Sequence, residues 1–213
     1  MSKLIYLANR NPGLSRERFV ARWRKHGALA MSLPLWRRLA RYVQASVLHP
    51  APIPGASTAY DAVGVLWYKD DAGRSSSAAD DADIATMAAD EVHTFAALVQ
   101  PGALQGDEEV LKQSGSGRTT AYLFFNDEAK ARRVAEGAAG SAASHRVALT
   151  LAWPLTEPGL PYRAVVDVSA EDVPGVKSAL GVGGLDAAGA DVAMVARDAV
   201  LWENLDGMFW EPT

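Results

Sequence analysis

The segment from Tyr60 to Tyr68, YDAVGVLWY, is the strongest strand signal in the chain. It is rich in β-branched and aromatic residues, and the charged run Lys69-Asp70-Asp71 closes it. Successive side chains of a strand point to opposite faces of its sheet, and both faces of this strand are apolar. The sheet that contains this strand must therefore be covered on both sides.

The patterns in the first 113 residues predict the order βαββαβ. Ser15 is a candidate N-cap for a helix whose apolar period begins at Phe19, and Pro34 breaks or restarts this helix. An alanine-rich, helix-prone stretch spans residues 84–98, and Pro101-Gly102 prevents a helix from continuing beyond it. The predicted strands are residues 3–9, 41–48, 60–68 and 109–113.

The order βαββαβ then repeats after a flexible segment, Ser114 to Gly117, which is the best candidate for a domain boundary. Two such units predict an α+β protein of two tandem ferredoxin-like repeats whose sheets pack against each other. The domains are residues 1–115 and residues 116–213, the second being a degenerate repeat with a C-terminal tail. Strands are predicted at 119–125, 146–153, 161–168 and 190–202, and helices at 127–136 and 173–180.

Composition excludes several classes of function. A formal charge of −4 gives no general attraction to nucleic acid, and the absence of cysteine excludes disulfides and thiolate metal sites. The four histidines lack metal-binding spacing. No window approaches the ~20 apolar residues that span a bilayer, and the apolar run near the amino terminus is too short for a signal peptide. We therefore expect a cytoplasmic protein with no metal and no membrane partner.

His26 is the leading candidate for a catalytic residue. Phe19, Trp23, His26 and Ala30 recur at helical spacing, so they share one face, which we expect to look onto the sheet. A histidine with a pKa near 6.5 can move a proton at neutral pH. The alternative is a core histidine bonded to a backbone carbonyl.

Other candidates are weaker. Tyr6 suits a phenolic or quinonoid substrate, and His93 is either a second proton-transfer group or a surface histidine. Side chains that could bind substrate come from the strands and the first helix, and each could instead belong to the core. Alternation along residues 60–68 places Tyr60 on one face and Asp61 and Trp67 on the other, and the sequence leaves open which face meets a pocket. The candidates for substrate binding are Asn9, Trp23, Tyr42, Asp61 and Trp67.

The first half resembles the EthD family of the dimeric α+β barrel superfamily. The resemblance covers roughly residues 3–112 and rests on KLIYLANRNPGLSRERFVARWRKHGAL, ARYVQ, YDAVGVLWY and ADEVHTF. Its most specific part is the pair Trp23 and His26. Ala28 stands where the family often has proline, and Val65 stands where it often has an acidic residue.

The resemblance implies a pocket between sheet and helices for a small aromatic or polyketide-like molecule. The second half shows no motif of the family, so the barrel formed within one chain is what the repeated element order predicts. The resemblance also implies that no cofactor is needed. We expect a cofactor-independent lyase that acts on an aromatic or phenolic substrate by acid–base chemistry. The alternatives are a cofactor-free monooxygenase and a non-catalytic binding protein. The chain could be a monomer or a homodimer.

Overall fold

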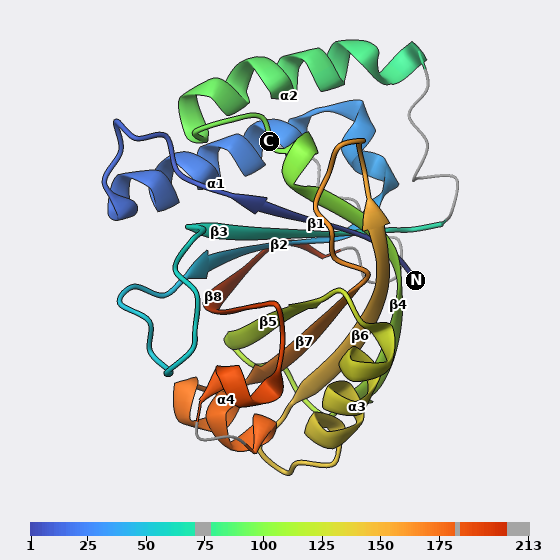
Figure 1. The fold of residues 1–213 in the computed structure, drawn as a ribbon. Helices are drawn as coiled ribbons and strands as arrows, with labels where there is room; N and C mark the ends of the chain where they lie inside the picture. Colours follow the sequence, from blue (N-terminus) through green and yellow to red (C-terminus); the bar gives the residue numbers. More distant parts are fainter. Residues whose placement is uncertain (71–77, 182–183, 204–213) are drawn as a thin grey trace.

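A computed structural model describes residues 1–70, 78–181 and 184–203. The strands in these residues are antiparallel and close into one barrel in the order β1-β3-β2-β8-β5-β7-β6-β4 (Figure 1). They are β1 Ser2–Ala8, β2 Leu39–Val47, β3 Ala62–Tyr68, β4 Ala103–Gln113, β5 Thr119–Phe125, β6 Arg146–Pro154, β7 Ala164–Ala170 and β8 Val192–Glu203. The α-helices are α1 Arg16–Ser32, α2 Asp81–Thr94, α3 Glu128–Ala139 and α4 Val173–Leu180.

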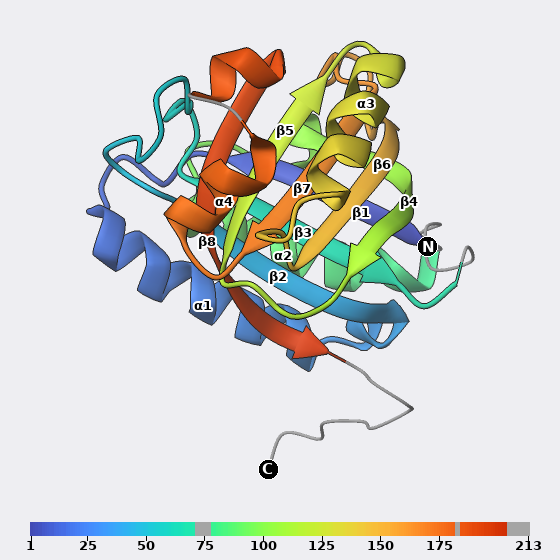
Figure 2. The same ribbon diagram turned by 90° about the horizontal axis from the view of Figure 1, so that it is seen from below.

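The element order is βαββαβ in each half, and the predicted fold class, tandem repeats that form an α+β barrel, is confirmed. The sheets face each other and also join edge to edge, through pairing of β2 with β8 and of β4 with β6 (Figure 2). Their inner faces enclose a core that includes Val65, Phe124, Val165 and Met194. This core accounts for one of the two apolar faces of β3.

The strand β4 begins six residues earlier than the sequence predicted. Ala103 to Asp107 pair with β1, and Leu104 to Gln113 pair with β6, so partners on both sides hold this stretch extended. Its local sequence, ALQGD, carries little intrinsic strand preference, and tertiary pairing decides its conformation.

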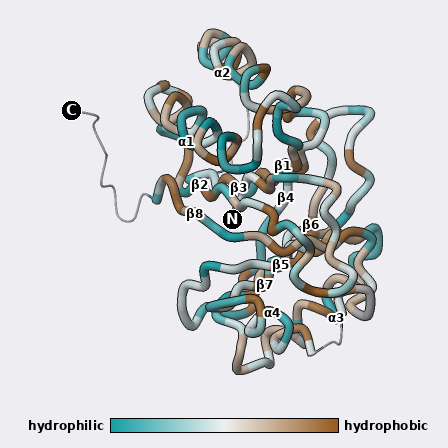
Figure 3. The backbone as a smooth tube through the Cα atoms, turned by 90° about the vertical axis from the view of Figure 1, so that its left-hand side faces the viewer, coloured by the Kyte–Doolittle hydropathy of each residue, from teal (hydrophilic) through white to brown (hydrophobic). Residues whose placement is uncertain are grey.

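The helices α1 and α2 cover the outer face of the first sheet (Figures 1 and 3). Ser15 caps α1 as predicted, because its side chain accepts a hydrogen bond from the Arg18 backbone N–H. Gly27 lets α1 approach the sheet closely, since a Cβ at this position would lie 2.5 Å from Leu201 and 2.8 Å from the Gln44 amide nitrogen. The other apolar face of β3 is thus buried under these helices.

The helices α3 and α4 cover the outer face of the second sheet, and the buried side chains that α3 contributes to this interface are small. Ala131, Ala135 and Ala138 bring α3 close to the strands. Ile53, from the loop between β2 and β3 in the first half, is buried in the same cluster. The Leu185 backbone N–H donates to the Pro54 carbonyl at 2.8 Å, so this loop is tied into the second half.

The predicted C-terminal tail, from residue 204 onward, lies outside the described residues. No helix in the part of the chain that is described is long and apolar enough to cross a membrane.

Candidate active site

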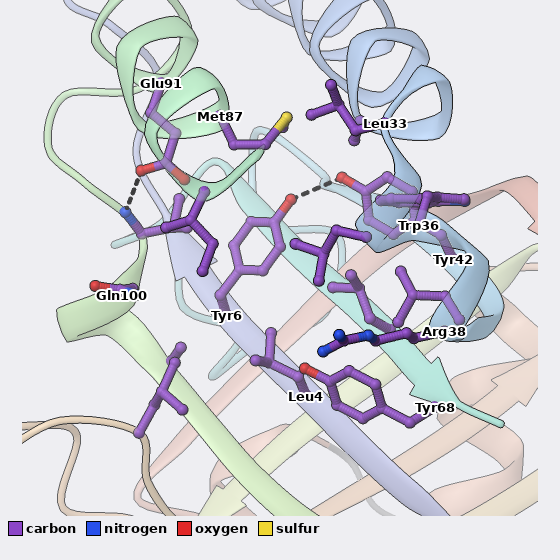
Figure 4. A pocket seen from close by; sticks show the side chains of 18 of the residues that line it. Leu4, Tyr6, Leu33, Trp36, Arg38, Tyr42, Tyr68, Met87, Glu91 and Gln100 are labelled. Carbon is purple, nitrogen blue, oxygen red and sulfur yellow. Dashed lines mark hydrogen bonds between the residues drawn. The ribbon is translucent and has the colours of Figure 1, made fainter. Parts of the chain in front are cut away.

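A cavity of about 280 Å³ lies between the outer face of the first sheet and the helices α1 and α2 (Figure 4). The walls are mainly apolar, as is usual for sites that bind small organic molecules. The apolar lining includes Leu4, Leu33, Trp36, Leu66, Met87 and Leu155. The polar side chains that reach the cavity are Tyr6, His26, Arg38, Tyr42, Tyr68, Glu91, Gln100 and Gln105.

His26 lines the cavity from α1 and is oriented by a carboxylate on α2. Its Nδ1 lies 2.7 Å from Asp90 Oδ2, and Arg22 also donates a hydrogen bond to Asp90. The His26 ring is 5% exposed and packs edge-on against Phe95, with 5.3 Å between ring centroids. The ring is therefore fixed by one hydrogen bond and one aromatic contact.

The protonation state of His26 follows from these contacts. Burial lowers the pKa of His26, and this effect outweighs the opposing influence of Asp90. Burial of Asp90 is outweighed by its hydrogen bonds from Arg22 and His26, so the pKa of Asp90 lies below its ordinary value. The neutral ring must then donate Nδ1–H to the carboxylate. Nε2 keeps its lone pair and has no hydrogen-bond partner among the described residues.

Two tyrosine hydroxyl groups form a pair on the sheet side of the cavity. The hydroxyl oxygens of Tyr6 and Tyr42 are 2.8 Å apart (Figure 4). Trp23 donates its indole N–H to the Tyr6 oxygen at 3.1 Å, and Gln44 donates its amide N–H to the Tyr42 oxygen at 3.0 Å. Only one of the two hydroxyl hydrogens is used between the tyrosines. The other has no acceptor in the described part of the chain and is available to a ligand.

Both tyrosines stay protonated at neutral pH, because burial raises the pKa of Tyr6 and of Tyr42 above the ordinary value. Gly64 makes the position of Tyr6 possible. It is the cross-strand partner of Tyr6 on β3, and a Cβ there would lie 2.0 Å from a carbon of the Tyr6 ring. The Tyr6 ring occupies the space that a side chain at position 64 would fill.

Glu91 brings a carboxyl group into the same cavity from α2. It is 9% exposed, and its Oε2 accepts a hydrogen bond from the Val99 backbone N–H at 3.0 Å (Figure 4). Oε1 has no partner among the described residues. Burial, reinforced by the neighbouring charge of Asp90, raises the pKa of Glu91 despite the hydrogen bond from Val99.

The structure brings together three of the predicted site residues on the cavity wall, Tyr6, His26 and Tyr42. Trp23 lies behind them, fully buried, and contacts the site through its hydrogen bond to Tyr6. The predicted placement of the pocket between the first sheet and its two helices agrees with this cavity.

Four predicted site residues lie elsewhere. His93 and Asn9 are exposed, His93 on the outer side of α2 and Asn9 just beyond β1. Asp61 pairs with Arg10 at 2.6 Å and holds loops at the end of the barrel. Trp67 points into the barrel, where its indole donates to Glu108 at 2.8 Å, because the even-numbered residues of β3 face the helices.

Glu91, which lines the cavity, and Asp90, which orients His26, were not among the site residues predicted from the sequence. Ile84, Met87 and Glu91 recur at helical spacing and all face the cavity, but the residues around them on α2 are mostly small or charged, so this spacing alone did not indicate a buried face. No group of three potential metal ligands occurs among the described residues.

Comparison with known proteins finds a family model that covers part of this site. A model of the EthD domain matches residues 11–98, the span that contains α1, β2, β3 and α2. Residues 11–98 are an EthD domain. His26, Tyr42, Asp90 and Glu91 all lie inside the EthD domain, and Tyr6 precedes it on β1. No curated protein matches the chain in sequence.

Solved structures share the fold of the whole chain. A candidate monooxygenase from Fusobacterium nucleatum is 10% identical with a TM-score of 0.56, over 100% of this chain and 98% of the other. An anthrone oxidase-like protein is 8% identical with a TM-score of 0.51, over 98% and 96%. A candidate chlorite dismutase is 10% identical with a TM-score of 0.50, over 93% and 94%. At such identities the likeness concerns the fold alone.

Proposed function

We propose that the chain is an enzyme that performs acid–base chemistry on a small aromatic or phenolic molecule, with no cofactor, in the cavity of its EthD domain. One observation carries this proposal. His26 is neutral, its Nδ1 is held by Asp90, and its unpartnered Nε2 belongs to a residue of the cavity wall. This arrangement is the one that a general base requires.

The proposed reaction begins with removal of an acidic C–H proton next to a ketone group. His26 Nε2 takes the proton, and the electron pair of the C–H bond moves onto the ketone oxygen to give an enolate. The unused hydroxyl hydrogen of the Tyr6–Tyr42 pair donates to this oxygen, so negative charge develops where a buried donor is already in place. The mainly apolar walls lower the local dielectric constant and so strengthen this interaction.

We favour a lyase, because the candidates for catalysis in this cavity, His26 and the tyrosine pair, are groups that take up or donate protons. In a dehydration the enolate expels hydroxide, which takes up a proton and leaves as water. In a decarboxylation the C–C bond to the carboxyl group breaks, carbon dioxide leaves, and the electron pair of that bond gives the enolate. The second candidate is a cofactor-free monooxygenase, in which the enolate supplies electrons to molecular oxygen. The names of two structural neighbours, a candidate monooxygenase and an anthrone oxidase-like protein, favour this alternative. A non-catalytic binding protein is the third.

Deuterium exchange tests whether the site removes this proton and forms the enolate. The purified protein is incubated in heavy water with 1-tetralone, a bicyclic aryl ketone, and exchange at the carbon next to the ketone is followed by NMR. We expect catalysed exchange, and His26→Ala should lower it by about 10² or more. His93→Ala is the matched control, because it removes an exposed histidine from the neighbouring helix. Absence of exchange in the wild-type protein would refute the acid–base proposal.

Oxygen uptake separates the two enzymatic alternatives. Anthrone has an acidic CH₂ group opposite its ketone and is oxidised at that carbon by oxygen. A monooxygenase should consume oxygen with anthrone in proportion to product, and this uptake should depend on His26. A lyase should show exchange without catalysed oxygen uptake. A binding protein should bind these ketones with an affinity that His26→Ala leaves unchanged.

A further inference from the structure

The cavity of the EthD domain contains a second proton-transfer group on the helix that supplies the orienting Asp90. Asp90 and Glu91 are adjacent in sequence and face different partners. Asp90 turns to α1 and binds Arg22 and His26, whereas Glu91 turns to the cavity and to the Val99 backbone. The site described so far, a base and a hydroxyl pair, does not use Glu91.

The contacts of Glu91 leave one of its oxygens free for chemistry. Oε2 is held by the Val99 N–H, and no basic side chain of the described residues pairs with the carboxyl group. Oε1 has no protein partner in the described part of the chain. The carboxyl group is near enough to Tyr6 for its charge to raise the pKa of that hydroxyl.

We propose that Glu91 is a catalytic general acid that protonates an oxygen leaving group, so that the substrate is a cyclic β-hydroxy ketone and the reaction is its dehydration. This inference rests on the proposed function. His26 takes the proton from the carbon between the ketone and the hydroxyl-bearing carbon, and the enolate oxygen is held by the Tyr6–Tyr42 pair. As the enolate collapses, a C=C bond forms, the C–O bond breaks, and Glu91 gives its proton to the departing oxygen.

The step balances without a co-reactant. One substrate molecule gives one unsaturated ketone and one water, and no electrons enter or leave. The turnover leaves His26 protonated and Glu91 ionised, and one proton transferred from His26 to Glu91 through solvent restores both. Burial raises the pKa of Glu91. This favours the protonated carboxyl group, which the step requires at its start.

Two related ketones test the inference. 3-Hydroxy-1-tetralone has a hydroxyl leaving group and dehydrates to 1-naphthol, which is fluorescent, whereas 1-tetralone has none and can only exchange its acidic hydrogens. Glu91→Gln should slow dehydration by about 10²-fold or more. It should leave deuterium exchange into 1-tetralone within about threefold, because removing that proton needs His26 and the tyrosine pair only. The glutamine can still accept the Val99 hydrogen bond, and a thermal melt checks the fold.

Each outcome has a separate meaning. Dehydration by Glu91→Gln at the wild-type rate would overturn the acid role and leave the proposed function standing. Parallel loss of exchange and dehydration in a folded Glu91→Gln protein would make Glu91 a positioning residue and also overturn the role. A wild-type protein that neither exchanges nor dehydrates would refute the proposed function and this inference with it. Glu109→Gln, an exposed change of the same kind on β4, is the control and should change neither rate.

Discussion

Replacing Asp90 with asparagine should put the proton of His26 on the wrong nitrogen. In the wild-type protein Arg22 donates to one oxygen of Asp90, and His26 Nδ1–H donates to the other. Arg22 can only donate, so the amide of asparagine would turn its oxygen to Arg22 and its NH₂ group to His26. His26 Nδ1 would then accept a hydrogen bond from the amide, and the ring would carry its proton on Nε2. A base in that tautomer cannot take a proton from the substrate.

The expected loss of activity is large and the loss of stability small. Exchange into 1-tetralone should fall by about 10² to 10⁴, the full contribution of a positioned base. Two hydrogen bonds to a charged carboxylate become hydrogen bonds to a neutral amide, which should lower the free energy of unfolding by about 1–2 kcal/mol. NMR gives the exchange rate, and denaturant unfolding of the same preparation gives the stability.

A second substitution tests the tautomer argument directly. Removing Arg22 in the Asp90→Asn protein frees the amide to rotate, so that its oxygen can again accept from His26 Nδ1. Arg22→Leu should therefore slow the wild-type protein only severalfold and should raise the exchange rate of Asp90→Asn by about tenfold or more. Equal rates for Asp90→Asn with and without Arg22 would refute the reasoning and would mean that Asp90 acts through its charge.

Three further predictions concern pH and packing. The exchange rate should rise with pH as His26 loses its proton, with a midpoint below the ordinary histidine pKa of about 6.5, because burial lowers the pKa of His26; a midpoint above that value would contradict the buried base. Gly64→Ala should displace the Tyr6 ring, reduce exchange by about tenfold and cost about 1–3 kcal/mol of stability, and an unchanged melting temperature would show that the ring is not fixed there. Burial alone would raise the pKa of Glu108, but Lys3 and Arg146 outweigh it and hold the pKa at about 2, against 4.5 for the ordinary side chain. This shift contributes about 3 kcal/mol to the free energy of unfolding, fully present above pH 4.5 and lost as the pH falls toward 2. Glu108→Gln should therefore make the stability of the protein depend less on pH between 4.5 and 2, as measured by acid unfolding followed by circular dichroism.

The sequence was sufficient for the parts of the fold that local patterns determine. The period of α1 placed His26 on the face toward the sheet, and the turn chemistry placed the Ser15 cap. The two apolar faces of β3 correctly indicated a sheet covered on both sides. They could not indicate which face of β3 points into the barrel and which lies under the helices, because both surroundings are apolar. Trp67 and Asp61 were candidates for the pocket for that reason, and the choice between the two faces stayed open.

Other parts of the site depend on tertiary contacts that leave no local trace. The alanine-rich sequence of α2 has too few large apolar residues to show its buried face, so Met87 and Glu91 were missed. Gln105 was missed with the first part of β4, whose extended conformation comes from pairing with β1 and β6. The hydrogen bond between His26 and Asp90 joins residues on two helices that are 64 positions apart in sequence, and no spacing rule predicts such a contact.

The loop between β2 and β3 belongs to the first half by sequence, yet its Ile53 is buried among the side chains under α3 and α4. The backbone N–H groups of Leu48 and Ser57 also donate to carbonyls of β8. Separating the halves would expose this isoleucine and four strand edges at once, so neither half has a complete core of its own. Unfolding should therefore be a single cooperative transition, with the same midpoint for a probe in either half. A gene cut at Ser114–Gly117 should give two fragments that fold only when they are produced together.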